Sequence, residues 1–269
     1  MRPLYFLKPF LPMALLSALF SGCAPTTLTT YKLEPASGDI VQLDGRPVTK
    51  ADRNGVTVVA SFEREELDYV ALDVEIKNNT DQPIEVNPAD FHFYALGAQQ
   101  DTLADPVAPD QPLFRGAADP SYEASRMGLK RKQEEKRLKQ AKVINTILLV
   151  AAIASDVSST SRSRTRSEWI SKRVSHDVAY QAIAAKRAID HGTFANRMQR
   201  YDYEEYRWRE LALRANTLKP GESVRGFVYL PKQKDARYLA ITYSIPETVD
   251  VPLLFKQQTV EERQRKKRR

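Results

Sequence analysis

The chain has 269 residues, with 41 lysines and arginines against 34 aspartates and glutamates, which gives a formal net charge of +7. A basic total of this kind is typical of nucleic-acid-binding proteins. The charge is divided, however, because residues 23–120 hold 7 basic and 17 acidic residues, whereas residues 121–214 hold 20 basic and 11 acidic residues. This acidic half argues against a nucleic-acid partner, and we expect the two parts to face each other or different partners.

Residues 1–22 have the composition of a secretory signal peptide. Arg2 and Lys8 give a positive start, an apolar core runs over residues 10–20, and Ser21 and Gly22 precede Cys23. The apolar core is too short for a membrane span. We therefore expect the chain to be exported, which also separates it from nucleic acid.

The sequence Leu19-Phe20-Ser21-Gly22-Cys23 resembles the lipobox of bacterial lipoproteins, with Phe20 where that motif usually has leucine. Cys23 is the single cysteine, so it has no intramolecular disulfide partner. The resemblance implies that the Cys23 sulfur receives a diacylglyceryl group and that cleavage leaves Cys23 as an acylated first residue, a firm membrane anchor. The alternative is an ordinary secretory signal followed by a buried cysteine.

The residues after Cys23 predict the location of such a lipoprotein. Ala24 and Pro25 lack the aspartate that retains many lipoproteins at the inner membrane, and residues 24–33 hold no acidic cluster of the kind that directs surface export. We expect an outer-membrane, lipid-anchored protein that faces the periplasm.

Strand signals occupy two separate parts of the chain. Residues 69–78 alternate apolar and polar side chains, residues 84–86 and 91–95 are short strands between turn residues, and "DG" at 44–45 and "NG" at 54–55 mark hairpin turns. Further strands are expected within 216–231, 237–245 and 249–255. The sequence thus predicts a tether over 23–38 and an antiparallel β-sandwich built from 39–119 and 216–255.

These strands also resemble a recurring bacterial domain with a telokin-like or immunoglobulin-like fold. The motif residues are Asn78-Asn79-Thr80, Pro83-Ile84, Asn87-Pro88, Asp90-Phe91 and Phe93, followed by Thr217-Leu218, Pro220-Gly221-Glu222, Gly226 and Val228. The resemblance covers roughly 110 residues and implies an immunoglobulin-like sandwich without shared catalytic residues.

Residues 120–215 predict a helical insertion that projects as a hairpin or small bundle. A charged helix is expected after Pro120 with Ser121 as its cap, and small polar residues at 158–167 interrupt it. The next helix carries an apolar stripe, and Gly192 is expected to end or kink it before a third helical stretch that begins at Phe194. The stripe consists of Val174, Val178, Ala182, Ala185 and Ile189.

An apolar segment at 143–157 is the most distinctive part of this insertion, and three interpretations remain open. It packs against the Val174–Ile189 stripe as the core of the hairpin, it forms an oligomer interface, or it lies in a lipid surface with the nearby arginines on phosphates. The candidate contact residues for a partner or membrane are Ile147, Leu148, Leu149, Val150, Arg162, Arg164 and Arg166.

The sequence offers little for catalysis. The three histidines are far apart, and the usual metal-binding, nucleophile and phosphate-binding motifs do not occur, so we expect no enzyme, metal site or cofactor. Residues 256–269 are expected to be a basic disordered tail. The sequence therefore indicates a non-enzymatic envelope protein whose helical arm binds another protein, or alternatively a module that binds an acidic lipid, glycan or cell-wall ligand.

Overall fold

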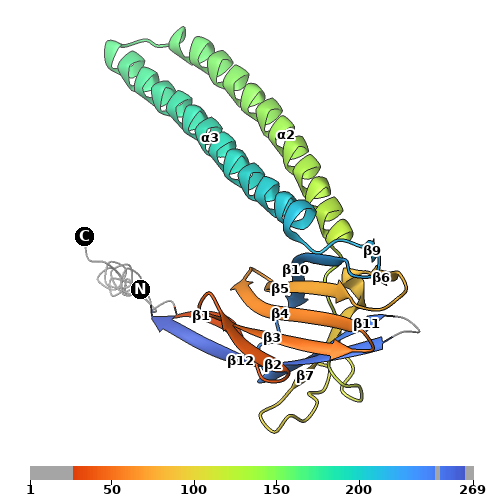
Figure 1. Cartoon of the computed structure of the whole chain (residues 1–269). Coiled ribbons are helices and arrows are strands. Elements are labelled where there is room, and N and C mark those ends of the chain that lie inside the picture. The colour runs from red at the N-terminus through yellow and green to blue at the C-terminus, as the bar shows by residue number, and fades with distance from the viewer. Residues whose placement is uncertain (1–26, 246–248, 264–269) are drawn as a thin grey trace, which may run out of the picture.

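The computed structural model describes residues 27–245 and 249–263, so Cys23 and the predicted signal peptide lie outside the described residues. Two antiparallel sheets form one body, and a long helical hairpin projects from it (Figure 1). The first sheet has the order β1-β12-β11-β7-β8. Its strands are Thr27–Pro35, Val249–Arg263, Tyr238–Ile245, Phe91–Leu96 and Phe114–Gly116.

The second sheet has the order β10-β5-β4-β3-β2. Its strands are Ser223–Pro231, Tyr69–Asn78, Val56–Glu65, Arg46–Arg53 and Asp39–Leu43. A small third pair joins β6 (Ile84–Val86) to β9 (Asn216–Leu218), and a short 3-10 helix covers Pro88–Asp90. The predicted strand at 69–78 is confirmed at both ends.

Both sheets contribute to one hydrophobic core. In β5, Val70, Leu72, Val74 and Ile76 are fully buried, and they face side chains such as Ile241 and Leu253 of the other sheet. This is the period-two pattern that the sequence showed, since alternate side chains of a strand point to opposite faces. Gly45 and Gly55 have positive φ angles in the β2–β3 and β3–β4 turns, which confirms both predicted hairpin turns.

The first sheet extends beyond the predicted limits at both ends of the chain. β1 lies inside the segment that was predicted as a tether, and β12 continues to Arg263, inside the segment that was predicted as a disordered tail. The two strands pair with each other in antiparallel register from Thr27 opposite Arg263 to Pro35 opposite Phe255. Each segment is polar in sequence, but pairing satisfies its backbone groups, which is why composition alone misplaced these boundaries.

The insertion forms two antiparallel helices of 41 residues each, α2 (Pro120–Thr160) and α3 (Arg166–Tyr206). The predicted break at 158–167 is confirmed by the turn between them. Ser121 is not the cap, because Asp119 accepts the backbone N–H groups of Ser121 and Tyr122 while Pro120 occupies the first helical position. Gly192 neither ends nor kinks α3, since a single glycine costs a helix only about 1 kcal/mol.

A second, smaller apolar cluster fixes the base of the hairpin on the second sheet. A short π-helical turn, Arg207–Leu211, ends the hairpin, and its Trp208 is buried against Tyr229 of β10 and Met127 of α2. Arg207 is also buried, and its guanidinium lies 4.8 Å from the Trp208 ring centre and 5.0 Å from that of Tyr229. Strand β10 is therefore covered on both faces, by the main core and by the hairpin base.

Candidate functional site

Polar and charged residues hold the two helices of the hairpin together. Near the base, Arg197 donates to Glu134 over 2.8 Å, and farther out the Asn145 side-chain amide donates to Asp190 over 2.9 Å. At the distal end, Ser159 Oγ and His176 Nε2 lie 2.7 Å apart. The seam between the helices thus contains a row of hydrogen bonds and ion pairs, together with half-buried apolar side chains such as Leu138, Leu149 and Phe194.

Hydrogen bonds stabilise the charged form of two carboxylates in this seam. Hydrogen bonds from Lys186 and Asn145 lower the pKa of Asp190, and the hydrogen bond from Arg131, at 2.8 Å, lowers the pKa of Glu205. A charged hydrogen bond is stronger than a neutral one, so these contacts fix the register of the helices at several levels.

The prediction that residues 143–157 pack against the stripe on α3 is wrong. Ten exposed apolar side chains instead form two stripes on the outer edges of the hairpin, away from the seam, and Ile144, Leu148 and Ile153 of α2 are exposed beside them. We call Val143, Ile147, Val150, Ala154 and Val157 the α2 edge, and Val174, Val178, Ala182, Ala185 and Ile189 the α3 edge; all ten residues are exposed. The stripe was located correctly in the sequence, but its partner is not α2.

The candidate contact residues lie in four places: on the α2 edge, beside it, in the seam and at the tip. Ile147 and Val150 are 61% exposed, and Leu148 beside them is 41% exposed. Leu149 is half-buried toward α3, so it belongs to the seam. Arg162, Arg164 and Arg166 are exposed at the turn between the helices, as far from the sheets as the hairpin reaches.

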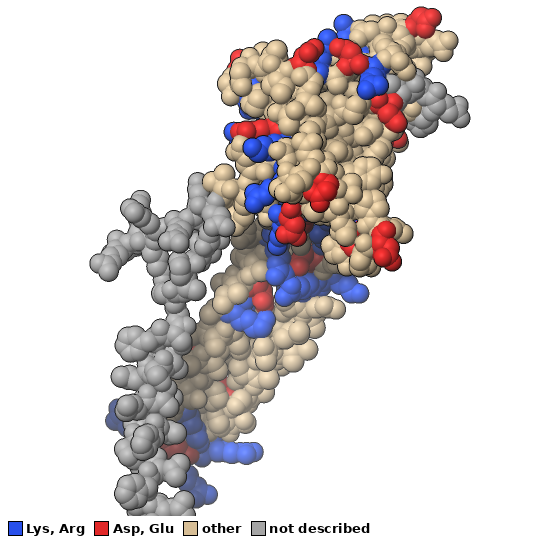
Figure 2. Space-filling view, turned by 90° about the horizontal axis from the view of Figure 1, so that it is seen from below, with Lys and Arg blue, Asp and Glu red and all other residues tan. Residues whose placement is uncertain are grey.

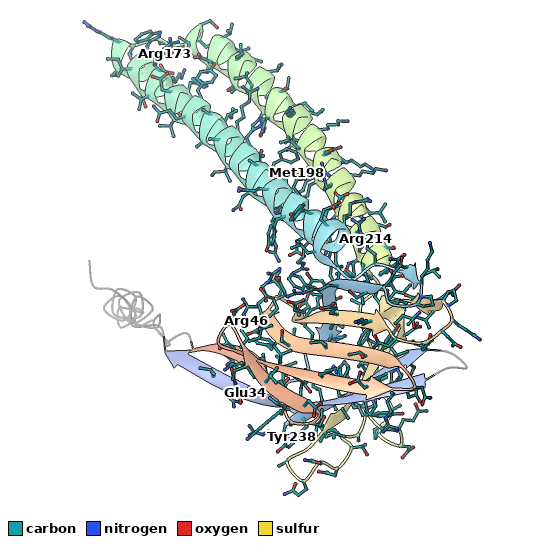
Figure 3. All side chains as sticks on the ribbon, viewed as in Figure 1. Glu34, Arg46, Arg173, Met198, Arg214 and Tyr238 are labelled. Atoms are coloured by element: carbon teal, nitrogen blue, oxygen red, sulfur yellow. The ribbon has the colours of Figure 1, made fainter. Side chains whose placement is uncertain are left out.

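Charged residues lie at both ends of the apolar part of the hairpin. Figure 2 shows basic residues near the sheets and at the far end, with a stretch between them that carries few charges. In α2 this stretch contains one charged residue, Asp156, between Lys142 and Arg162, and Asp156 turns inward to accept from Tyr180 over 3.3 Å. Figure 3 shows the side chains along both helices, with Arg173 at the distal end and Met198 nearer the base.

By length and composition alone, α2 is apolar enough to cross a membrane, and almost none of its apolar window is buried. The neighbouring helix α3 is less apolar. At the same height α3 carries Arg173, Asp177 and Arg187, all exposed. A hairpin that entered the bilayer would carry these three charges with it.

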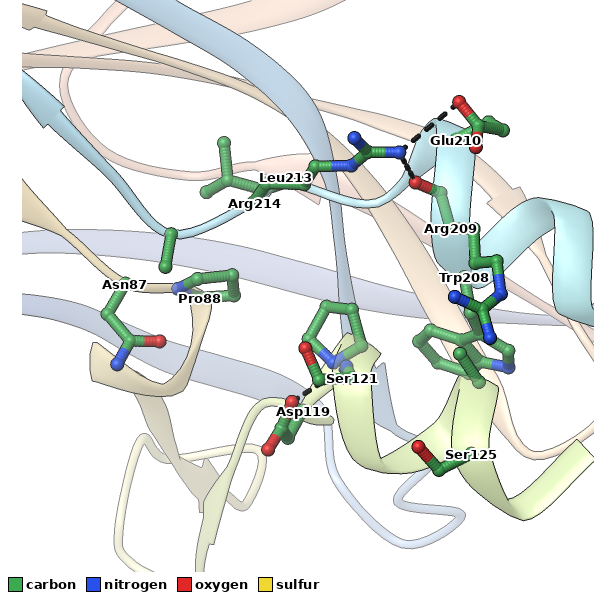
Figure 4. Close-up of a pocket in the computed structure, with 13 residues that line it drawn as sticks. Asn87, Pro88, Asp119, Ser121, Ser125, Trp208, Arg209, Glu210, Leu213 and Arg214 are labelled. Atoms are coloured by element: carbon green, nitrogen blue, oxygen red, sulfur yellow. Dashed lines mark hydrogen bonds and ion pairs between the residues drawn. The ribbon is translucent and has the colours of Figure 1, made fainter. Parts of the chain in front are cut away.

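Two clefts lie at the junction between hairpin and sheets. The larger, of about 580 Å³, is lined by both parts of the protein; at its rim Asp119 accepts from the Ser121 backbone, and Arg214 pairs with Glu210 over 3.2 Å (Figure 4). The smaller, of about 230 Å³, is lined by Tyr69, whose pKa is raised by burial and by the Glu123 carboxylate. Both clefts are open to solvent and polar, and neither is an enclosed apolar pocket.

Within the described residues, no three His, Cys, Asp or Glu side chains are grouped as a metal site would require. His176, one of the three histidines, belongs to the seam through its contact with Ser159. Sequence reasoning missed the role of Arg207 at the junction, and the only signal for it was the adjacent Trp208.

Comparison with known proteins gave no relationship on which to base a function: no family model, no curated protein and no solved structure matches this chain.

Proposed function

We propose that this protein is a non-enzymatic, lipid-anchored protein of the bacterial outer membrane, whose paired sheets are a platform and whose helical hairpin is an arm that binds a partner protein in the periplasm. The anchor rests on the position of Cys23 directly after an apolar segment and two small residues. The facing antiparallel sheets, together with the Asn-Asn-Thr and Pro-Gly-Glu turn motifs, support the further proposal of an immunoglobulin-like platform.

The observation that carries the proposal is the exposed apolar surface on the outer edges of the hairpin. Each apolar side chain that moves from water into an interface gains roughly 1.5–3 kcal/mol. Scattered apolar residues are normal on a surface, whereas contiguous patches mark interaction sites. The α2 edge continues over four helical turns without an exposed charge, which is the pattern expected of a surface that is covered in the working protein.

A protein partner fits this surface better than the interior of a bilayer. Both helices would have to enter together, because a short turn joins their distal ends and the sheets hold their bases. Asp177 and Arg187 of α3 would then enter the hydrocarbon, at a cost of about 2.5–3.5 kcal/mol each at the membrane centre, together with the ion pair of Arg173 and Asp156. At a protein interface the same residues can remain at the solvated rim.

Photo-crosslinking in intact cells tests the arm. A photoreactive amino acid replaces Ile147, which points outward, and in a control chain it replaces Val107, an isolated apolar residue that is 89% exposed on a loop of the platform. We expect a protein adduct from position 147 and none from position 107. Adducts with lipid alone, or equal adducts from both positions, would overturn the assignment of the arm.

Mass spectrometry of the protein isolated from its host tests the anchor. The expected first residue is Cys23 with an acylated sulfur, and a Cys23→Ser variant is expected in the soluble fraction. An unmodified thiol, or a different first residue in the mature chain, would refute the anchor without affecting the crosslinking result.

A further inference from the structure

Resting on the proposed function, we infer that the protein that covers the hairpin is a second copy of this chain, with the α2 edge of one copy packed on the α3 edge of its neighbour. The inference follows from the spacing, height, direction and charge of the two edges.

The α2 edge has the spacing of a helix that packs against another helix. Its members follow one another at intervals of four, three, four and three residues. The α3 edge has intervals of four, four, three and four. Intervals of three and four keep side chains on one stripe of a helix. The alternation on the α2 edge is the heptad spacing of knobs-into-holes packing, whereas the two successive intervals of four on the α3 edge depart from that spacing. Each edge is therefore suited to contact a helix.

The two edges lie at the same height on the hairpin. The contacts of Asn145 with Asp190 and of Asp156 with Tyr180 connect the helices at two levels. Val150 lies midway along α2 between Asn145 and Asp156, and Ala185 lies midway along α3 between their partners, Asp190 and Tyr180. A neighbouring copy with the same orientation would thus bring its Ala185 to the level of Val150.

The edges face in opposite directions, because each lies on the side of its helix away from the seam. One bound helix of another protein would cover one edge and leave the other in water. A row or ring of copies covers both edges at once, since each copy presents an α2 edge to one neighbour and an α3 edge to the other. Contacts of this head-to-tail kind generate rings or open rows.

Charge decides which edges meet. Toward the sheets, the α2 edge continues into three exposed lysines, Lys132, Lys136 and Lys139. Packing α2 on α2 in parallel would bring two such rows together, and like charges repel. The α3 edge continues instead into Asn196, Gln199 and Tyr203, which are exposed and uncharged, and into one exposed arginine, Arg200, which lies 4.0 Å from Glu204. The α2-on-α3 contact therefore brings fewer like charges together than an α2-on-α2 contact does.

Each edge spans little more than two heptads, which is short for a free coiled coil. The proposed lipid anchor compensates for this length. Copies confined to one membrane surface meet at a high effective concentration, so that weak contacts suffice for association.

Disulfide trapping in cells tests the arrangement. Two full-length variants with different tags, Val150→Cys and Ala185→Cys, are expressed together and oxidised, and adducts that carry both tags are measured. We expect about tenfold more adduct from this pair than from Val150→Cys expressed with a differently tagged Val150→Cys, because a disulfide requires Cβ atoms about 3.5–4.5 Å apart. The unsubstituted chain, which contains only Cys23, sets the background.

A greater yield from the Val150→Cys pair would overturn the α2-on-α3 contact, and background yields from both pairs would overturn self-association. The inference also predicts the mass of the position-147 adduct, which should be twice that of the chain. Capture of a different protein at that position would overturn the second copy while leaving the proposed function intact. As a second variant, Ile147→Asp should abolish the mixed-tag adduct and leave the thermal unfolding midpoint of the purified monomer unchanged, since Ile147 is exposed.

Discussion

Arg207 is the residue that joins the hairpin electrostatically to the second sheet. Its guanidinium lies 2.6 Å from Glu66 and 2.8 Å from Glu204, and its side chain is only 3% exposed. A buried ion pair adds little compared with an apolar replacement, but removal of one partner leaves the other charge unpaired. Glu66 and Glu204 are both largely buried, and of the two only Glu66 has a second close cationic partner, Arg64, at 2.7 Å.

We therefore expect Arg207→Ala to lower the free energy of unfolding by about 3 kcal/mol. Urea unfolding at neutral pH measures this change. Arg207→Lys is the matched control and should recover only part of the loss, because lysine lacks the planar fork that contacts two carboxylates and two rings. Full stability in the alanine variant would show that the junction does not depend on this ion pair.

Tyr229 gives the junction a dependence on alkaline pH. Burial raises the pKa of Tyr229 to about 12, while its hydroxyl has no hydrogen-bond partner among the described residues. In the unfolded chain the same group loses its proton near its ordinary value of 10.0. The unfolded state thus binds fewer protons between about pH 10 and 12, so stability falls as pH rises through this window.

The variant Tyr229→Phe should be at least as stable as the parent at pH 7, because it removes a buried hydroxyl without a partner. Between pH 10 and 12 its stability should fall less steeply than that of the parent. Unfolding curves at a series of pH values measure both effects. Parallel decline of the two chains would contradict a shifted Tyr229 pKa.

At the scale of elements, replacement of a glycine by alanine should have opposite effects on stability in helix α3 and in strand β10. Gly192 lies within α3, and a Cβ atom placed there meets nothing within 4 Å. Gly192→Ala should stabilise the isolated monomer by about 0.5–1 kcal/mol, since glycine weakens a helix interior. A Cβ atom at Gly226 of β10 would lie 2.6 Å from the Leu213 Cα. Gly226→Ala should therefore destabilise by about 1–3 kcal/mol. Thermal unfolding measures the change in stability of each variant, and a change of the same sign in both would contradict this placement of the two glycines.

The strands could be predicted closely because each carries information in its own residues. In β5 the alternation of Val70, Leu72 and Val74 with polar neighbours defines one buried face, and the glycine turns define the ends of nearby strands. The partner of each helix face could not be predicted in this way. Both the seam and the edges of the hairpin have helical spacing, and spacing does not indicate which of two stripes faces inward.

Hydrophobicity indicated the wrong face of α3 as the one that contacts α2. Val174 and Val178 were expected inside because apolar residues are usually buried, whereas the seam uses Asn145, Asp190 and their charged neighbours. The candidate residues Ile147 and Val150 were identified from the sequence, but their exposure follows from this inversion. Only the three-dimensional pairing of α2 with α3 shows that the apolar edges lack a partner within the described part of the chain.

At the scale of the whole molecule, the first sheet closes the body by joining the two ends of the chain. Thr27 at the start of β1 lies opposite Arg263 at the end of β12, so the first and last described residues lie at the same edge of the body. The hairpin projects from a different side (Figure 1).

Two truncations test whether the polar end of β12 is part of this body. Removal of residues 256–269 deletes eight residues of β12, including Gln257, whose buried amide donates to Gln233 and Ala236 over 2.7 and 2.8 Å. At about 1 kcal/mol for each lost hydrogen bond, the two amide bonds and part of the pairing with β1 together cost at least about 3 kcal/mol of unfolding free energy. Removal of residues 264–269 alone takes away no described strand pair and should leave the unfolding midpoint unchanged. Equal unfolding midpoints for the two truncated chains would show that residues 256–263 do not contribute to the stability of the body.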